Sequence, residues 1–187
     1  GIGYYGAINS NKTFTEEDMP ENDFISEICV KWEQAASQFK LLKVPVTIFR
    51  IGVVLSNEGG ALEKMNTPLF LSVLGNGKQI MPWIHIEDLT NLFVKAIVGN
   101  KFIGIYNAVS PKNDSNKTIT KILGSVLDKI VLPLNLPSFV LKLILGDLAV
   151  ILLKGVKVSS EKTTKYYLFK YNTLKEALAD IYKSNDI

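Results

Sequence analysis

The sequence predicts an α/β fold organised around a parallel sheet. Short runs rich in β-branched residues alternate along the chain with segments of helical periodicity, the pattern of strand–helix–strand units. The run 44–51 carries no charge before Arg50, which is typical of a strand buried on both faces. The last third of the chain is mainly helical by the same criteria. We therefore expect a parallel sheet with flanking helices, followed by a small, mainly helical C-terminal region.

The first elements are defined by glycines, polar residues and one helix cap. Residues 1–6 have the pattern of a strand end entering a glycine turn, and residues 7–22 that of a long loop. Asn22 or Asp23 can cap the helix that follows. Apolar residues recur on one face of this helix, namely Ile25, Ile28, Trp32, Ala35, Ala36 and Phe39. Further strands are expected over 44–51, 80–86, 103–109 and 165–171, further helices over 61–74, 87–98, 118–127 and 173–182, and a loop over 110–116.

The most apolar segment spans 130–153. Pro133, Pro137, Lys142 and Asp147 interrupt it, whereas a membrane span needs about 20 consecutive apolar residues. Lys142 and Asp147 fall on different sides of a helix, and a helix that is apolar on nearly all sides is usually packed between other elements. We expect a buried helix and no membrane span. A helix lying on a membrane surface or against a partner is the alternative.

Composition excludes several classes of function. The 187 residues are 47% apolar and 21% charged, as in an ordinary globular domain, with or without a small appendage. Lysines outnumber the one arginine and are spread along the chain, and the net charge is only +3, so we expect no nucleic-acid partner. The single cysteine and the single histidine exclude an internal disulfide, a multi-cysteine zinc site and a His–His metal pair. No secretory signal pattern opens the sequence, and we expect a cytoplasmic protein.

The glycine pattern near the start of the chain does not predict a nucleotide-binding site, and two Tyr–Lys pairs do not predict a catalytic site. Gly1, Gly3 and Gly6 match G-x-G-x-x-G on paper, but tyrosines fill the interior and no helix follows promptly, so a turn after a strand is the better interpretation. Tyr166 with Lys170, like the pair at 171 and 175, has the Y-x-x-x-K spacing of short-chain reductases. Residues four apart share a face only in a helix, and neither pair lies within one by pattern, so we treat both as coincidence.

Three polar residues are candidates for a functional role because of their positions in the predicted elements. His85 ends a predicted strand before two acidic residues; a hydrogen bond to a loop is favoured over a metal ligand, so no metal site is expected. Arg50 also ends a strand, where open α/β sheets place their ligand crevice. It can hold a phosphate or carboxylate bidentately, or pair with Glu58 or another loop acid, and both interpretations stay open. Cys29 has no histidine near it in sequence and is interpreted as a buried or half-buried thiol.

Several motifs occur in one order along the chain: 3–6 (GYYG), 32–36 (WEQAA), 50–55 (RIGVVL), 59–65 (GGALEKM), 83–89 (WIHIEDL) and 106–108 (YNA). In that order they resemble the predicted nucleoside-diphosphate-sugar epimerases, a family of atypical extended short-chain dehydrogenase/reductases. The stretch from 132 to 178 is similar to the small domain of unknown function that ends the same proteins. The resemblance covers essentially the whole chain.

The resemblance implies a Rossmann-type parallel sheet with the following division. Residues 1–109 would form the C-terminal part of an NAD(P)-binding Rossmann domain. Residues 110–187 would form a helical, substrate-side region that contains the small family-specific domain at about 133–183. The chain would begin at the fifth strand, after the glycine-rich pyrophosphate loop. We therefore expect NADP or NAD in the complete parent protein and no tightly bound cofactor on this chain alone.

The resemblance also implies where a ligand would lie. Tyr5, Arg50, Gly52 and His85 are expected nearest the crevice for cofactor or substrate: Tyr5 to stack or hydrogen-bond, Arg50 to hold an anion, and Gly52 to allow close backbone approach. A nucleotide-sugar-like small molecule is the implied ligand. The catalytic tyrosine and lysine of the family correspond here to Ile25 and Cys29, and the catalytic residues are therefore unknown.

Three hypotheses for function follow. The first is a portion of an NAD(P)-binding sugar-nucleotide epimerase or reductase-like protein without the usual Tyr/Lys pair, inactive as an isolated chain. The second is a non-catalytic cofactor-sensing or protein-interaction protein on the same fold. The third is a membrane-associated scaffold using 132–153. If the first four strands and their covering helices are absent, Phe24, Ile28 and Trp32 would be incompletely buried. We then expect self-association through the exposed sheet edge.

Overall fold

A computed structural model describes residues 1–99, 102–146 and 149–183. The strands are β1 (Asn9–Phe14), β2 (Thr47–Ile51), β3 (Val53–Leu55), β4 (Phe70–Leu71), β5 (Ile80–His85), β6 (Gly104–Ala108), β7 (Asn113–Ser115), β8 (Ile130–Val131) and β9 (Gly155–Val158). Four pairings are parallel, β2 with β6, β3 with β5, β1 with β9 and β4 with β8, and β7 alone joins antiparallel, on β5. The expected α/β fold with parallel pairing and flanking helices is confirmed.

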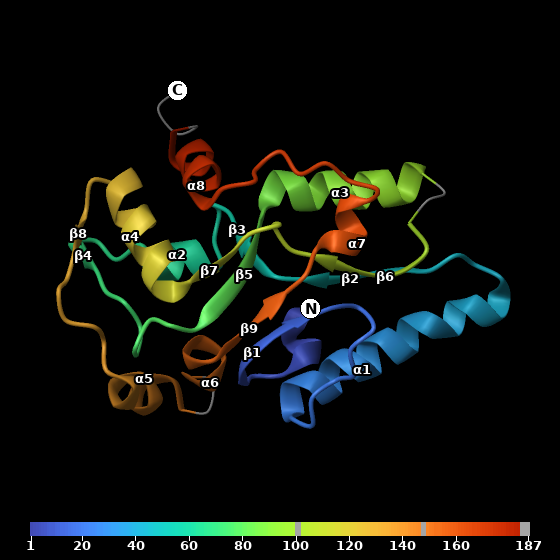
Figure 1. Cartoon of the computed structure of the whole chain (residues 1–187), viewed down its shortest axis with the longest axis horizontal. Coiled ribbons are helices and arrows are strands. Elements are labelled where there is room, and N and C mark those ends of the chain that lie inside the picture. The colour runs from blue at the N-terminus through green and yellow to red at the C-terminus, as the bar shows by residue number, and fades with distance from the viewer. Residues whose placement is uncertain (100–101, 147–148, 184–187) are drawn as a thin grey trace.

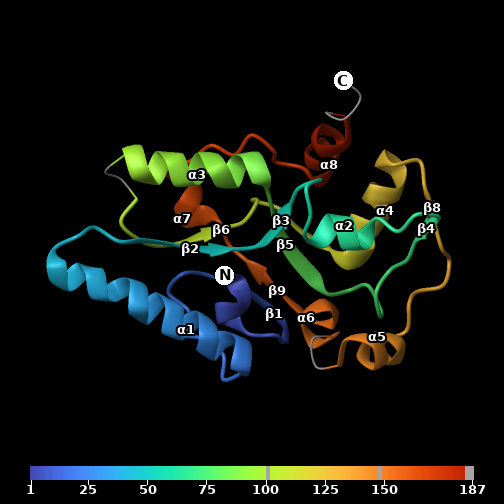
Figure 2. The same ribbon diagram turned by 180° about the vertical axis from the view of Figure 1, so that it is seen from behind.

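Helices surround these strands (Figure 1). They are η1 (Ile2–Tyr5), α1 (Phe24–Ser37), η2 (Gln38–Leu42), α2 (Ala61–Met65), α3 (Ile86–Val98), α4 (Asn116–Val126), α5 (Ser138–Leu145), α6 (Ala149–Leu153), α7 (Glu161–Thr164) and α8 (Leu174–Lys183). In both views α3 runs along one side of the β2–β6 pair and α1 along the other (Figures 1 and 2). Helix α1 begins as expected, because the Asp23 carboxylate accepts the Ser26 backbone N–H at 2.8 Å.

The core joins residues from both ends of the chain. One cluster packs Leu55 and Trp83 of the strands against Leu123 of α4 and Leu178 of α8, all fully buried. A second cluster packs Phe49 of β2 beneath α3 and includes residues 167 and 169 from the C-terminal segment. The C-terminal region is therefore part of the same apolar core as the strands.

Several expected elements are wrong, for reasons that lie outside local sequence. Residues 1–6 contain the 3₁₀ helix η1 rather than a strand end, and 7–22 contain β1, a polar strand defined by its pairing with β9 near the other end of the chain. The expected helix over 61–74 ends at Met65, where β4 pairing takes over. Similarly, 110–116 contain β7, and 165–171 form no strand because their backbone bonds to α3 instead.

The apolar face expected on α1 is largely uncovered. The side chains of Phe24 and Trp32 are 75% and 69% exposed, whereas Ser26 and Cys29 are the buried positions of this helix. Ile28 is half-buried. The incomplete burial expected for this face is thus observed.

The helix expected to be buried within 130–153 is instead two short helices, and α5 lies at the surface. Phe139, Leu143 and Ile144 are 70%, 85% and 71% exposed, and of the described α5 side chains only Leu141 is buried. The prediction of a helix packed between other elements is wrong here, because nothing in the described chain covers this face. Asp147, part of the same expectation, lies outside the described residues. Across the described ranges, every helix is too short or too polar to cross a membrane.

Candidate functional site

Arg50 lies near the end of β2, and its side chain is buried and bonded to other residues of the protein. Its side chain is 1% exposed and forms a bidentate pair with Glu33 of α1, through Nε to Oε1 at 2.8 Å and Nη2 to Oε2 at 2.9 Å. The Tyr4 ring lies over the guanidinium, 3.4 Å from Cζ to the ring centroid. Burial opposes the charge of Arg50, but hydrogen bonds with Glu33 and Tyr5 hold its pKa above the usual value. The acid partner is a helix residue, not Glu58.

Tyr5 continues the same chain of hydrogen bonds. Its hydroxyl is fully buried, accepts from Arg50 Nη1 at 3.0 Å and donates to Asn107 Oδ1 of β6 at 2.7 Å. Burial raises the pKa of Tyr5 to about 12, so the hydroxyl stays protonated at neutral pH. We call Tyr4, Tyr5, Glu33, Arg50 and Asn107 the Arg50 network.

Asn107 connects this network to the C-terminal region. Its backbone N–H donates to Glu16 Oε1 at 2.7 Å, and its side-chain amide donates to the Ser159 carbonyl at 3.0 Å. Its own carbonyl accepts from the Thr163 hydroxyl at 2.7 Å. Every polar group of this buried asparagine is therefore bonded to protein, as expected of a residue that fixes structure.

Gly52 lies where the chain leaves the β6 pairing of β2 and enters the β5 pairing of β3. A Cβ atom at this position would stand 2.5 Å from the Pro82 carbonyl oxygen and 2.9 Å from Val109 Cγ1. The close approach predicted for Gly52 is thus an approach of one strand of this chain to another. Beside it lies a pocket of about 290 Å³, which we call the Gly52 pocket. Ile25, at the position assigned to the family tyrosine, is in its lining.

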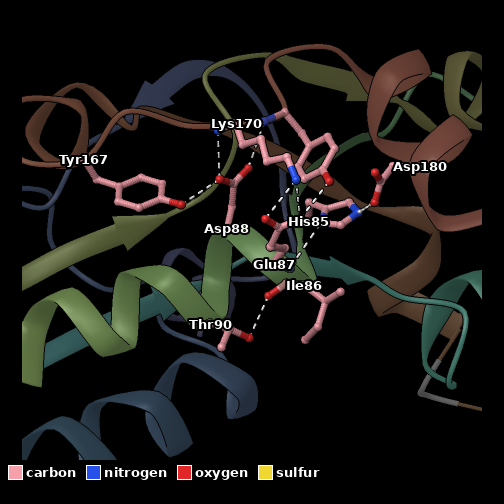
Figure 3. Close-up of polar contacts among 9 residues, drawn as sticks. His85, Ile86, Glu87, Asp88, Thr90, Tyr167, Lys170 and Asp180 are labelled. Carbon is pink, nitrogen blue, oxygen red and sulfur yellow. Dashed lines mark hydrogen bonds and ion pairs between the residues drawn. The ribbon is translucent and has the colours of Figure 1, made fainter. Parts of the chain in front are cut away.

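His85 belongs to a different place, at the junction of β5 and α3 (Figure 3). Its ring is 3% exposed and stacks on Tyr171, with 3.8 Å between centroids. Nδ1 accepts the Glu87 backbone N–H at 3.1 Å and so caps α3. Nε2 has no hydrogen-bond partner in the described chain and lies 3.5 Å from Asp180 Oδ2. Burial lowers the pKa of His85, which favours the neutral ring.

Carboxylates at the start of α3 hold the C-terminal segment around His85. Glu87 accepts Lys170 Nζ at 2.9 and 2.8 Å and the Tyr171 hydroxyl at 2.8 Å, contacts that lower the pKa of Glu87. Asp88, 1% exposed, accepts the Tyr167 hydroxyl at 2.7 Å and the backbone N–H groups of Lys170 and Tyr171. We call His85, Glu87, Asp88, Lys170, Tyr171 and Asp180 the His85 cluster. The spacing of Tyr166 and Lys170 forms no shared helix face, since both lie outside helices.

The His85 cluster has the composition of a metal site but not the chemistry of one. Ligand atoms of His85, Glu87 and Asp180 lie within 4.8 Å of one another. Because Nδ1 accepts an N–H, the neutral ring carries its proton on Nε2, the nitrogen that faces Asp180, and this nitrogen has no lone pair to offer. Glu87 is moreover neutralised by Lys170. The arrangement instead fastens the C-terminal segment to the first turn of α3.

The four predicted ligand-site residues therefore fall in three places. Tyr5 and Arg50 bond directly to each other, Gly52 lines the pocket, and His85 is in its own cluster. Sequence reasoning missed Glu33, although it stands in the WEQAA motif and a lone arginine at a buried strand end requires an acid somewhere. It also missed the role of Asn107, although this residue stands in the YNA motif at 106–108.

Comparison with solved structures identifies the class of fold to which this chain belongs. The structure matches dTDP-glucose 4,6-dehydratase from Bacillus anthracis in complex with NAD at a TM-score of 0.68 and 17% identity, over 99% of this chain and 60% of that one. It matches the nucleoside-diphosphate sugar epimerase from Corynebacterium glutamicum at a TM-score of 0.74 and 28% identity, over 96% of this chain and 35% of that one. The fold is that of the Rossmann-type epimerases.

Nearer relatives define the family. The chain is 36% identical to the chloroplastic epimerase family protein SDR39U1 homolog of Arabidopsis thaliana, over 96% of this chain and 52% of the relative. It is 31% identical to the human epimerase family protein SDR39U1 solved with NADPH, with a TM-score of 0.87 over 98% of this chain and 63% of that one. Residues 136–181 match a domain of unknown function, DUF1731. The chain belongs to the epimerase family of atypical short-chain dehydrogenase/reductases, and it spans 52% and 61% of the first two curated relatives.

The Arg50 network predicts unequal roles for two adjacent tyrosines. Tyr5→Phe should lower the free energy of unfolding by about 1–3 kcal/mol, because it leaves a buried guanidinium N–H and the Asn107 amide oxygen without a partner. Tyr4→Phe keeps the ring over Arg50 and should change stability by less than about 0.5 kcal/mol. Urea denaturation followed by circular dichroism measures both. Equal effects of the two substitutions would contradict the network.

His85 predicts a pH dependence of stability. Its folded pKa lies below the ordinary value of 6.5, so as pH falls the unfolded chain takes up a proton first. The stabilisation is complete above about pH 6.5 and is lost progressively as pH falls below it toward the folded pKa. Ordinary carboxylates and lysines titrate outside this window.

The matched variant is His85→Asn, which retains a side chain suited to capping α3 but cannot titrate. Urea denaturation at pH values from about 7.5 down to 5.5 should show a free energy of unfolding that decreases with decreasing pH for the wild type. For the variant, the free energy of unfolding should stay constant over this range. A wild-type profile that is flat, or that rises toward acid pH, would show that burial does not keep this ring neutral.

Proposed function

We propose that this chain forms the small-molecule side of an NAD(P)-binding epimerase family protein, with the ligand in the Gly52 pocket. The observation that carries the proposal is the pocket itself. It lies where 1–7, 51–53 and 80–82 meet 151–156 of the C-terminal region, so ligand would contact strand ends and the appended helices together. Sequence identity of 31% to a human protein solved with NADPH supports a nicotinamide cofactor for the complete protein.

The residues described do not fit a whole dinucleotide. The sequence contains no strand–GxGxxG–helix segment for a pyrophosphate, and its one arginine is already paired with Glu33. The apolar walls of the Gly52 pocket suit an uncharged ring or chain, not two phosphates. NADP or NAD therefore depends on protein outside these 187 residues, and no reaction step is assigned to it here.

A specific observation favours the second candidate, a non-catalytic cofactor-sensing or interaction protein. The lining residues of the Gly52 pocket include no hydroxyl, carboxylate, thiol or imidazole side chain. Ile25 has no proton to transfer, and Cys29 lies behind it, its sulfur 3.5 Å from where a Cβ of Gly3 would stand. The tyrosine that usually exchanges a proton with a sugar hydroxyl thus has no counterpart in the described lining, whose one titratable side chain is Lys154. Self-association remains part of the proposal. The nucleotide-sugar-like ligand that the family resemblance implies would, like the dinucleotide, depend on protein outside these 187 residues, because the Gly52 pocket does not suit two phosphates.

Calorimetric titration with NADPH tests the proposal on two proteins. One is the 187-residue chain, and the other is the same chain joined to the part of the human relative that the match leaves uncovered. We expect micromolar binding to the joined protein and none in that range to the chain alone. Because the described lining contains no hydroxyl, carboxylate, thiol or imidazole side chain, we also expect no epimerisation of UDP-glucose.

Micromolar binding to the chain alone would reveal a pyrophosphate site within these residues. Absence of binding to both folded proteins would overturn the NAD(P) proposal. Rapid epimerisation that survives Cys29→Ser would show that proton transfer comes from elsewhere and would favour the catalytic candidate.

A further inference from the structure

We infer that the Gly52 pocket selects a compact apolar molecule bearing one anionic group, such as a medium-chain carboxylate, and that Lys154 binds the anion. The inference rests on the proposed function, since it concerns the same pocket. It departs from the nucleotide-sugar ligand that the family resemblance implies, and it follows from the chemistry of the pocket walls.

The walls are aliphatic on every side. The apolar side chains in the lining come from η1, α1, the β2–β3 junction, α2, β5, α6 and β9: Ile2, Ala7, Ile25, Ile51, Val53, Ala61, Ile80, Met81, Pro82, Ile151, Leu152 and Val156. The volume of about 290 Å³ holds about ten non-hydrogen atoms at the ~30 Å³ that a water occupies in the liquid. An eight-carbon carboxylate fills this space, whereas a sugar nucleotide has several times as many atoms.

The pocket cannot satisfy the hydroxyls of a sugar with side chains. A polar group buried without a partner costs about 1–3 kcal/mol, so several sugar hydroxyls would outweigh the gain from the walls. The polar side chains nearest the strand ends are committed elsewhere: Arg50 to Glu33, Tyr5 to Asn107, and His85 to the start of α3. An apolar body, in contrast, gains about 25 cal/mol for each Å² that it removes from water.

Lys154 supplies the one polar-ended side chain of the described lining. It follows α6 directly, is exposed, and its ammonium has no hydrogen-bond or ion-pair partner within the described ranges. Among the described residues, no aspartate or glutamate is present in the lining to neutralise it. An ammonium group beside an apolar pocket attracts an anion, and the apolar chain of that anion can then lie along the pocket walls.

Calorimetry on the 187-residue chain tests this with octanoate, 1-octanol and UDP-glucose as probes. Octanoate should bind at least about tenfold more tightly than octanol, which has the same chain without the charge. UDP-glucose should neither bind nor displace octanoate. In Lys154→Met the preference for octanoate over octanol should disappear while octanol affinity is kept. Lys157→Met is the matched control, an exposed lysine three residues on that is absent from the lining, and it should change nothing.

A second variant tests the location of the binding site. Ala61→Leu adds bulk to the pocket wall and should weaken both octanoate and octanol; a thermal melt confirms that it folds. If the variant does not fold, the comparison of Lys154→Met with Lys157→Met still decides. Octanoate binding that is indifferent to Lys154→Met, equal binding of both probes, or displacement of octanoate by UDP-glucose would each overturn the inference. Absence of octanoate binding to the chain would also overturn the inference. The NADPH titration of the joined protein would still test the proposed function separately.

Discussion

The structure depends on one buried charge. Arg50 ends β2 with a side chain that is 1% exposed, and a buried guanidinium must have an anion within hydrogen-bonding reach. Glu33 provides it from α1, and this bidentate pair fixes that helix against the strand. Tyr5 then fixes η1 to both Arg50 and β6, through Asn107. Removing one member of a buried pair costs about 3–5 kcal/mol, a large part of the stability of an ordinary domain.

This constraint also determines what chemistry is left for function. Residues that look reactive in the sequence hold the framework together: Arg50 and Tyr5 in one network, His85 as the cap of α3 and the partner of Tyr171. The described lining of the Gly52 pocket has aliphatic walls, and Lys154 is its one charged side chain. The fold, which is similar to that of a solved nucleoside-diphosphate sugar epimerase, here surrounds a pocket whose described lining lacks hydroxyl, carboxylate, thiol and imidazole side chains.

The sequence predicted what local pattern determines. Asp23 is the cap of α1, the β-branched run became β2, and the order of motifs identified the family. Prediction from the sequence failed where a distant segment determines the local structure. The strand Asn9–Phe14 exists because Gly155–Val158 pairs with it, and a burial expectation for α5 required cover that the described chain does not provide. The partner of Arg50 lies 17 positions earlier, on the side of α1 that carries Ser26 and Cys29 and not on the apolar face that periodicity predicted.

A double-mutant cycle on Arg50 and Glu33 tests the central claim most directly. We predict that Arg50→Met and Glu33→Gln each lower the free energy of unfolding by about 3–5 kcal/mol. The double variant should lose no more than the worse single variant, a coupling of at least about 3 kcal/mol. Additive losses below about 0.5 kcal/mol each would contradict the account, because Arg50 would then be free to serve a ligand.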